Sequence, residues 1–242
     1  MGAGLAFDAA HERYTRQDFI LLNYHVHIPL PDPMVNPSTV ARRTFYGVNS
    51  SPSYTFDGEM DGGGGSAEGA KPLFDSKIDP KIQEHLAVAP EASVKVQATQ
   101  VGGTVKAKAS VSGVKSKSDK LRVQIVLAEK DVTYSGENGT RFHPMTVRGM
   151  AVDAKSAQGF ALAPGKGGSF EYTFDLAKLM ADAKEGLTNY ETKERKGEYT
   201  FREKKHEIKN GLVAVAFVQD EATKKVLQAA FFDIPAPKAA KK

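Results

Sequence analysis

The spacing of apolar residues changes near residue 90, and the change divides the chain into two predicted regions. Residues Leu5 to Tyr14 have apolar positions at helical spacing, which predicts an amphipathic helix. Residues 19–28, FILLNYHVHI, form a nearly continuous apolar run that ends in a proline-rich stretch. This pattern predicts a strand that leads into an irregular loop.

Further elements are expected before residue 90. Asn36 can cap a helix that runs through Tyr46, with Gly47 as its stop. A short strand is predicted over 53–56, followed by an Asp-Gly turn, and apolar residues four apart predict a helix over 74–86. The order of elements is therefore helix, strand, helix, strand, helix.

After Pro90 the apolar spacing becomes two, which is typical of strands with one buried face. Two alternating runs around Gly102-Gly103 predict a β-hairpin. Further strands are expected over residues 121–129, 145–150, 169–175, 199–206, 212–219 and 226–234, interrupted by one helix over 176–185 with Gly186 after its end. We therefore predict an α+β protein: an α/β domain over 1–90, an antiparallel β-sandwich over 91–235 and a disordered tail over 236–242.

Composition limits the function classes. The 33 Lys and Arg residues are nearly balanced by 29 Asp and Glu residues and are scattered along the chain, so no nucleic-acid partner is expected. No run of 18 apolar residues occurs, so no membrane span is expected. The chain contains no cysteine, and it therefore performs no thiol or disulfide redox chemistry. No cofactor fingerprint appears either, and none is expected to bind.

Three segments carry a family resemblance: AFDAAHERY, FILLNYHVHIPLPDPMVNP and ARRTFYGVNSSPSYTFDG. Together they resemble a thioredoxin-like domain of exported bacterial proteins, over about residues 3 to 88. The segments TYSGENGTRFHPMTVRGM and GLVAVAFVQDEATKKVLQAAFFDI resemble the β-sandwich that follows such domains in related outer-membrane-associated proteins. The resemblance implies a periplasmic or cell-envelope location.

The chain departs from this family at its beginning. The resemblance implies a strand and a Cys-x-x-Cys pair immediately before the first helix, where this sequence has Met1-Gly2-Ala3. That strand would be the central one of the sheet, so the strand over 19–28 would lack its principal neighbour. Either the sequence starts inside a longer natural protein, which we favour, or another segment or subunit fills the gap.

The resemblance also implies a cis-proline at Ser51-Pro52, which would expose the backbone of Ser51 for pairing with an extended peptide. An ordinary turn proline is the alternative. His25 and His27 lie two apart on the predicted strand, so their imidazoles would share a face and could share a metal ion. The alternative is a pair of histidines that bond to the backbone near the proline loop.

The third candidate is an anion-binding site. Arg141, His143 and Arg148 follow one another closely and could bind an anion, although alternation along a strand would place many such charges in solvent. No nucleophile elbow and no recognisable pair of catalytic carboxylates is present, so whether the protein is an enzyme stays open.

The leading hypothesis is a non-catalytic binding or scaffold protein of the bacterial cell envelope, with its binding surface near His25, His27 and Ser51-Pro52. A protein or peptide partner is expected at the proline loop, and a homo-oligomer is a further option. The alternative is a thiol–disulfide oxidoreductase whose Cys-x-x-Cys lies upstream of Met1. Metal handling through the paired histidines is a third, weaker hypothesis.

Overall fold

The computed structural model describes residues 2–136, 139–152, 159–209 and 211–236, which form helices and antiparallel sheets. Its first part contains helices α1 (Gly2–Arg13), α2 (Pro37–Tyr46), α3 (Ala70–Leu73) and α4 (Asp79–Leu86), the hairpin β1 (Ser53–Phe56) and β2 (Glu59–Gly63), and a π-helical turn, η1 (Phe74–Ile78), between α3 and α4. These elements agree closely with the predicted helix, hairpin and helix positions. The exception is residues 19–28.

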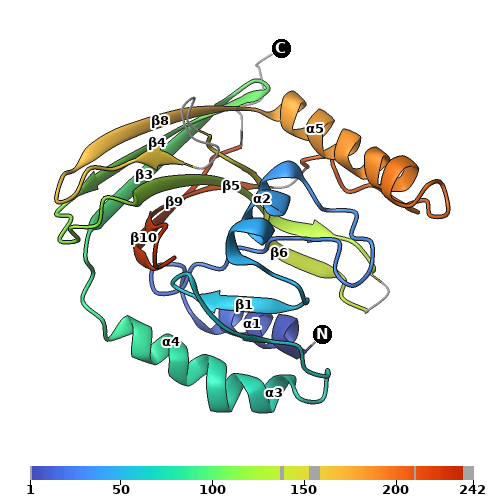
Figure 1. Cartoon of the computed structure of the whole chain (residues 1–242), viewed down its shortest axis with the longest axis horizontal. Coiled ribbons are helices and arrows are strands. Elements are labelled where there is room, and N and C mark those ends of the chain that lie inside the picture. Colours follow the sequence, from blue (N-terminus) through green and yellow to red (C-terminus); the bar gives the residue numbers. More distant parts are fainter. Residues whose placement is uncertain (1, 137–138, 153–158, 210, 237–242) are drawn as a thin grey trace.

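The second part is dominated by two antiparallel sheets (Figure 1). The larger has the order β10-β9-β5-β6 with β7 paired to β5, and the smaller has the order β3-β4-β8. Their bounds are β3 (Ser93–Val101), β4 (Thr104–Ser112), β5 (Leu121–Thr133), β6 (Phe142–Met150), β7 (Phe160–Ala161), β8 (Gly168–Asp175), β9 (Leu212–Asp220) and β10 (Val226–Asp233).

The two sheets share an apolar cluster. Strand β4 alternates buried and exposed positions along its whole length, and its buried side chains join the cluster with residues of β5 and β9. Strand β9 is buried at all positions, because a second cluster on its other face contains Val213, Val215 and Phe217. Burial on both faces explains why its sequence is almost wholly apolar.

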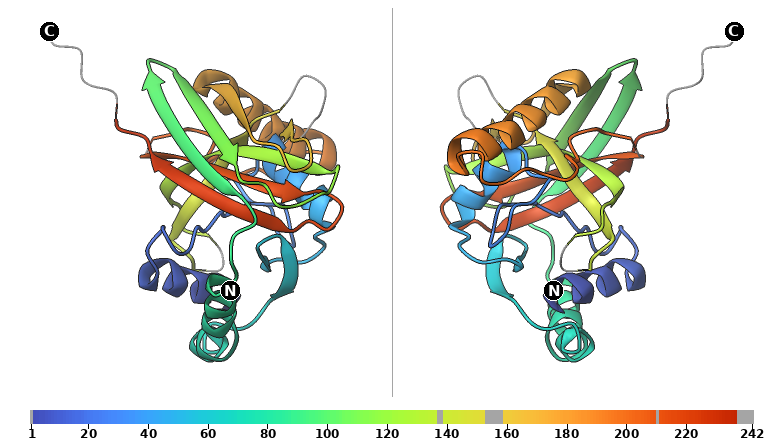
Figure 2. Two further views of the ribbon diagram at one scale, coloured as in Figure 1. Left: turned by 90° about the vertical axis from the view of Figure 1, so that its left-hand side faces the viewer. Right: turned by 90° about the vertical axis from the view of Figure 1, so that its right-hand side faces the viewer.

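A separate apolar cluster joins α1 to the hairpin and to α4. Ala3, Ala6 and Ala10 face Tyr54, Phe56, Phe74, Ile78 and Ile82. Small side chains let the helix backbone approach these large residues closely. Figures 1 and 2 show α1, α3 and α4 at one end of the molecule, and α5 (Leu176–Asn189) at the opposite end.

Helix α2 has strong signals at both ends. The Asn36 side chain accepts hydrogen bonds from the backbone N–H groups of Ser38 and Thr39, and Thr39 completes a capping box. Gly47 follows the helix with φ of 68°, the left-handed conformation that favours glycine. These caps fix the register of the helix, and so the direction of Arg42 and Tyr46.

The β1–β2 turn is attached to the larger sheet. The N–H of Val226 donates to the carbonyl of Asp57 at 2.6 Å. Gly58 has φ of 88°, and a Cβ there would lie 1.9 Å from the carbonyl oxygen of Lys224. Only glycine permits this approach, so the hairpin turn is held against the turn between β9 and β10.

Three predicted features are wrong. Residues 19–28 are extended but form no strand; only Asn23 makes an isolated bridge, to Thr146 of β6. Residues 199–206 form no strand because other partners take their backbone groups: the Phe201 N–H donates to the Glu191 side chain.

The predicted stop at Gly186 is wrong as well. Helix α5 continues to Asn189 and into the π-helical turn η2 (Tyr190–Glu194). Leu187 and Tyr190 pack with Val35 and Phe201 beyond the glycine, and this burial outweighs the propensity of glycine to end a helix. The predicted tail falls mostly on 237–242, outside the described residues. In the described part of the chain, no helix has the length and apolar character needed to cross a membrane.

Candidate functional site

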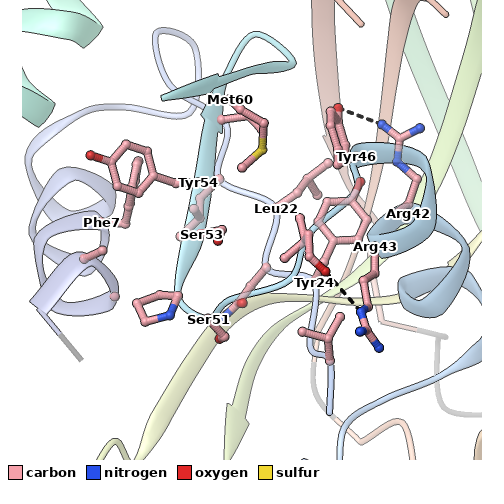
Figure 3. Close-up of a pocket in the computed structure, with 18 of the residues that line it drawn as sticks. Phe7, Leu22, Tyr24, Arg42, Arg43, Tyr46, Ser51, Ser53, Tyr54 and Met60 are labelled. Atoms are coloured by element: carbon pink, nitrogen blue, oxygen red, sulfur yellow. Dashed lines mark hydrogen bonds between the residues drawn. The ribbon is translucent and has the colours of Figure 1, made fainter. Parts of the chain in front are cut away.

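A cavity of about 330 Å³ lies between α1, the extended residues 19–26, α2 and β1, with β9 and β10 at its base (Figure 3). We call it the slot, and define it by its two long walls, residues 19–24 and 50–55. Figure 3 shows Phe7 and Tyr54 on one side of it and Tyr24, Tyr46 and Arg42 on the other.

Both long walls are unbroken runs of consecutive residues. Every residue from Phe19 to Tyr24 lines the slot, and so does every residue from Ser50 to Thr55. A strand that presented only one face to a cavity would contribute alternate residues. The unbroken runs therefore indicate that the edges of both segments face the slot.

The first edge belongs to residues 19–24. The N–H of Asn23 donates to Met145 at 3.0 Å, and its carbonyl accepts from Val147 at 3.0 Å, so the Asn23 peptide groups point to β6. Peptide groups alternate between the two edges of an extended chain, so those of Leu22 and Tyr24 point away from β6. Within the described part of the chain, neither residue makes a backbone hydrogen bond.

The second edge belongs to β1, which pairs with β2 alone among the described strands. The Pro52 carbonyl accepts from the Gly64 N–H at 2.8 Å on the β2 side. By the same alternation, the Ser53 peptide groups point to the other edge, which faces the slot. Two unpaired backbone edges thus border one cavity.

The side chains of residues 20, 22 and 24 pack on the outer face of the larger sheet, whereas Phe19 joins the α1 cluster. The segment is therefore held from both sides by apolar contacts and at one point by Asn23. It keeps the extended shape of a strand without a full ladder of hydrogen bonds.

Of the residues predicted from sequence, Ser51 and Pro52 line the slot, and the bond between them is cis. His25 and His27 do not line it; Val26, between them, does. The predicted surface that combined all four residues is therefore divided between two faces of the extended segment.

The histidines instead form a polar cluster with Asp32. His25 Nδ1 lies 2.7 Å from Asp32 Oδ2, and His27 Nδ1 accepts the Asp32 N–H at 3.0 Å. His27 stacks on Tyr190, with the ring centres 3.9 Å apart. Burial lowers the pKa of His27 to about 4. Of the two histidines, His27 bonds to a backbone group, whereas His25 bonds to the Asp32 carboxylate.

His143 completes this cluster. Its ring lies edge-on to His25, with the centres 5.1 Å apart, and burial lowers its pKa to about 4. Asp32 has a lowered pKa because the His25 contacts outweigh its burial. Among the residues that the structure describes, no three His, Asp or Glu side chains are grouped so as to hold a metal ion.

The predicted anion site is spread over different environments. Arg141 is exposed, which agrees with the expectation that many of these charges lie in solvent. His143 and Arg148 are buried, which differs from that expectation. Arg148 donates through Nε to Glu129 Oε2 at 2.6 Å and through Nη1 to the carbonyl of Lys205. The hydrogen-bond donors of Arg148 are therefore already bonded to groups of the protein itself.

Sequence reasoning missed the arginines of α2. Arg42 and Arg43 both line the slot, and Arg42 is only 2% exposed. Arg42 Nη2 donates to the Tyr46 hydroxyl at 2.9 Å and to Gln219 Oε1 at 2.8 Å. One signal was present: Gln219 is a polar residue that directly follows the apolar run Leu212–Val218 of strand β9.

Asp8 of α1 also lines the slot. Burial, together with the neighbouring Glu12 carboxylate, raises its pKa to about 6. The α1 side of the slot is therefore only weakly anionic near that pH.

No protein-family model and no curated protein matches the chain. Among solved structures, HBP35 of Porphyromonas gingivalis is similar over 84% of this chain, with 13% identity and a TM-score of 0.51. The chain spans 59% of that structure's length. At this identity, the similarity concerns the fold alone.

Two other structures are similar over shorter parts or with poorer superposition. β-Glucosidase 3B from Thermotoga neapolitana, solved with glucose, covers 60% of this chain at 9% identity, and the chain covers 16% of it, with a TM-score of 0.27. The alkylpurine DNA glycosylase AlkC of Pseudomonas fluorescens, bound to DNA, covers 69% at 11% identity, and the chain covers 37% of it, with a TM-score of 0.28. Scores this low carry no functional argument.

Proposed function

We propose that this protein is a non-catalytic binding protein of the bacterial cell envelope that accepts an extended peptide of a partner protein into the slot as an added β-strand. The observation that carries the proposal is the pair of unpaired backbone edges, at Leu22 and Tyr24 on one wall and at Ser53 on the other. One extended chain between them can form hydrogen bonds on both sides.

The energetics favour an occupant of this kind. Half-buried peptide groups without partners cost free energy, and an added strand supplies their partners. Apolar wall residues such as Phe7, Leu22 and Phe217 favour a peptide with alternate apolar side chains. The 242 residues contain no cysteine, so thiol chemistry by this chain does not compete with the proposal.

The test uses two helical glycines as a matched pair. A Cβ at Gly4, which lines the slot, or at Gly186, in α5, would meet no atom within 4 Å. The probe is a fluorescein-labelled, C-terminally amidated hexapeptide of alternating valine and threonine, followed by fluorescence polarisation. We expect saturable binding that Gly4→Leu weakens about tenfold or more, whereas Gly186→Leu binds as the wild type does.

Hydrogen exchange provides the second measurement. Binding should slow the exchange of the Leu22, Tyr24 and Ser53 amides, because the added strand bonds to these edges. The proposal is wrong if the peptide does not saturate, or if Gly4→Leu binds it as tightly as the wild type does.

The oxidoreductase alternative requires a separate measurement. Intact mass and a count of alkylatable thiols, made on protein from its native source, distinguish it from a binding module. A heavier species with two thiols supports the oxidoreductase, whereas a mass equal to this chain with no thiol supports the binding protein. Fractionation of the source cells tests the envelope location, which rests on the sequence resemblance.

A further inference from the structure

Arg42 is a buried cation without an anionic partner among the residues that the structure describes. Its side chain lines the slot at 2% exposure, and Nε and Nη1 have no hydrogen-bond partner among the described residues. The ion pairs found in the described ranges include none from Arg42 to a carboxylate. An unpaired charge in such a place is costly, so the arrangement is incomplete.

The groups around Arg42 do not compensate its charge. Nη2 contacts two neutral groups, the Tyr46 hydroxyl and the Gln219 amide. Tyr24 lies on the same side of the slot; burial raises its pKa to about 12 although contact with Arg42 lowers it in part, so this neighbour of Arg42 is a neutral phenol. The rings of Phe45 and Tyr46 lie 4.5 and 4.8 Å from the guanidinium carbon and offer only cation–π attraction.

Arg43 adds a second guanidinium at the same end. It lines the slot and donates through Nε to the Val48 carbonyl at 3.2 Å, and it too has no carboxylate partner among the described residues. The acidic residues that line the slot are Asp8, whose pKa is raised, and Asp57, which bonds to His85. The slot therefore has a positive end at α2.

We infer that the peptide strand carries a carboxylate, directed to the α2 end and bound by Arg42 and Arg43. This inference rests on the proposed function and specifies the chemistry of its ligand. Both an acidic side chain and a C-terminal carboxylate supply the group, and a hydrogen bond with an ionised acceptor is about twice as strong as a neutral one.

Four hexapeptides distinguish the sources. They share a Val-Thr-Val-Thr-Val segment and end in glutamate amide, glutamine amide, glutamine with a free carboxylate, or glutamate with a free carboxylate. We expect an acidic peptide to bind at least about tenfold more tightly than the fully neutral one. If glutamate amide shows the gain, the side chain is the source; if glutamine with a free carboxylate shows it, the terminus is.

Arginine variants locate the effect. Arg42→Gln and Arg43→Gln keep polar side chains but remove the charge, and the exposed Arg202→Gln is the control. The gain should disappear in Arg42→Gln, shrink in Arg43→Gln and persist in Arg202→Gln. If Arg42→Gln does not fold, the inference is still tested by the affinities of the acidic and neutral peptides for the wild type and for Arg43→Gln.

Other results overturn the inference. If all four peptides bind equally well, the carboxylate site is wrong while the proposed function stands. A gain that persists in Arg42→Gln and Arg43→Gln alike also overturns it. If no peptide binds, both proposals fail together.

Discussion

Two regions of the molecule each combine an extended apolar segment with a buried arginine. The regions differ in how the backbone of the segment is paired and in whether the arginine has a carboxylate partner. In the larger sheet, β9 is paired on both edges, by β5 and β10, and Arg148 of β6 bonds to Glu129. Around the slot, residues 19–24 are bridged only at Asn23, and Arg42 has no carboxylate partner among the described residues. Comparable burial of the two arginines therefore does not imply equal satisfaction of their polar groups, and the less satisfied region is where a ligand has most to gain.

The two arginines offer the largest contrast in stability. Arg148→Met removes the guanidinium that balances the buried charge of Glu129, and we expect the free energy of unfolding to fall by about 3–5 kcal/mol. Arg42→Met removes a buried charge that has no carboxylate partner, so we expect a loss of less than about 1 kcal/mol, or a gain. Urea denaturation of the two variants measures the difference. Equal losses would contradict the contrast between the regions.

The same comparison applies to two leucines. Leu127 of β5 is fully buried, and Leu127→Ala should cost about 2–5 kcal/mol of unfolding free energy. Leu22 is half-buried on the wall of the slot, and Leu22→Ala should cost about 1 kcal/mol. Thermal unfolding followed by circular dichroism compares them. A larger loss for Leu22 would mean that the slot segment is packed as firmly as the sheet.

The histidine cluster lies where the two regions meet, and it makes stability depend on pH. His27 and His143 have folded pKa values of about 4, below 6.5, so the stability that they contribute is present above pH 6.5 and is lost as the pH falls to about 4. Asp8, with its pKa raised to about 6, acts in the opposite direction over nearly the same range. Burial lowers the pKa of His11 as well, so three histidines act against Asp8, and we expect a net fall in unfolding free energy between pH 6.5 and 4.

Asp8→Asn sharpens this test. The substitution removes the opposing group, so the fall in unfolding free energy with decreasing pH should become steeper. Urea denaturation at intervals between pH 4 and pH 7 measures both proteins. A profile that is flat or rises toward pH 4 in the wild type would contradict the assignment.

The smallest contrast concerns helix caps. Asn36 caps α2 and also donates through Nδ2 to the buried Val147 carbonyl at 2.8 Å, whereas Asp175 caps α5 at the surface. Asn36→Ala should cost about 1–2 kcal/mol and Asp175→Ala about 0.5–1 kcal/mol of unfolding free energy. Asn36→Ala should also weaken peptide binding, because the cap sets the direction of Arg42. Fluorescence polarisation with an acidic hexapeptide checks this second effect.

Periodicity predicted most of the elements, because their patterns record which faces are buried. The alternation in β4 and the caps of α2 appear as the sequence predicts. Periodicity failed for residues 19–28, because an apolar run reports that side chains are buried and not that a neighbouring strand exists. It failed for 199–206, where side chains such as Glu191 bond to the backbone. The first error concerns a strand more than a hundred positions away, at Met145 and Val147, and the second a side chain ten positions away.

The candidate site was predicted in part. Ser51-Pro52 lines the slot, but the predicted histidines face another side and the two arginines of α2 were missed. Nothing local distinguishes Arg42 from the exposed arginines of the chain. Its burial follows from the packing of α2 on β9, whose residue Gln219 is 177 positions away and bonds to it. The spacing of residues in a single sequence does not show contacts between positions so far apart.

The close approach of Gly58 to Lys224 has a consequence for the kinetics and cost of recognition. Since the hairpin turn is fixed to the larger sheet, and Asn23 fixes the opposite wall, the separation of the two walls is set before any peptide arrives. A preorganised receptor loses little conformational entropy on association, and the loss falls on the incoming chain. Any side chain at position 58 would collide with the Lys224 carbonyl and release the hairpin turn from the larger sheet, converting a rigid receptor into an adaptable one.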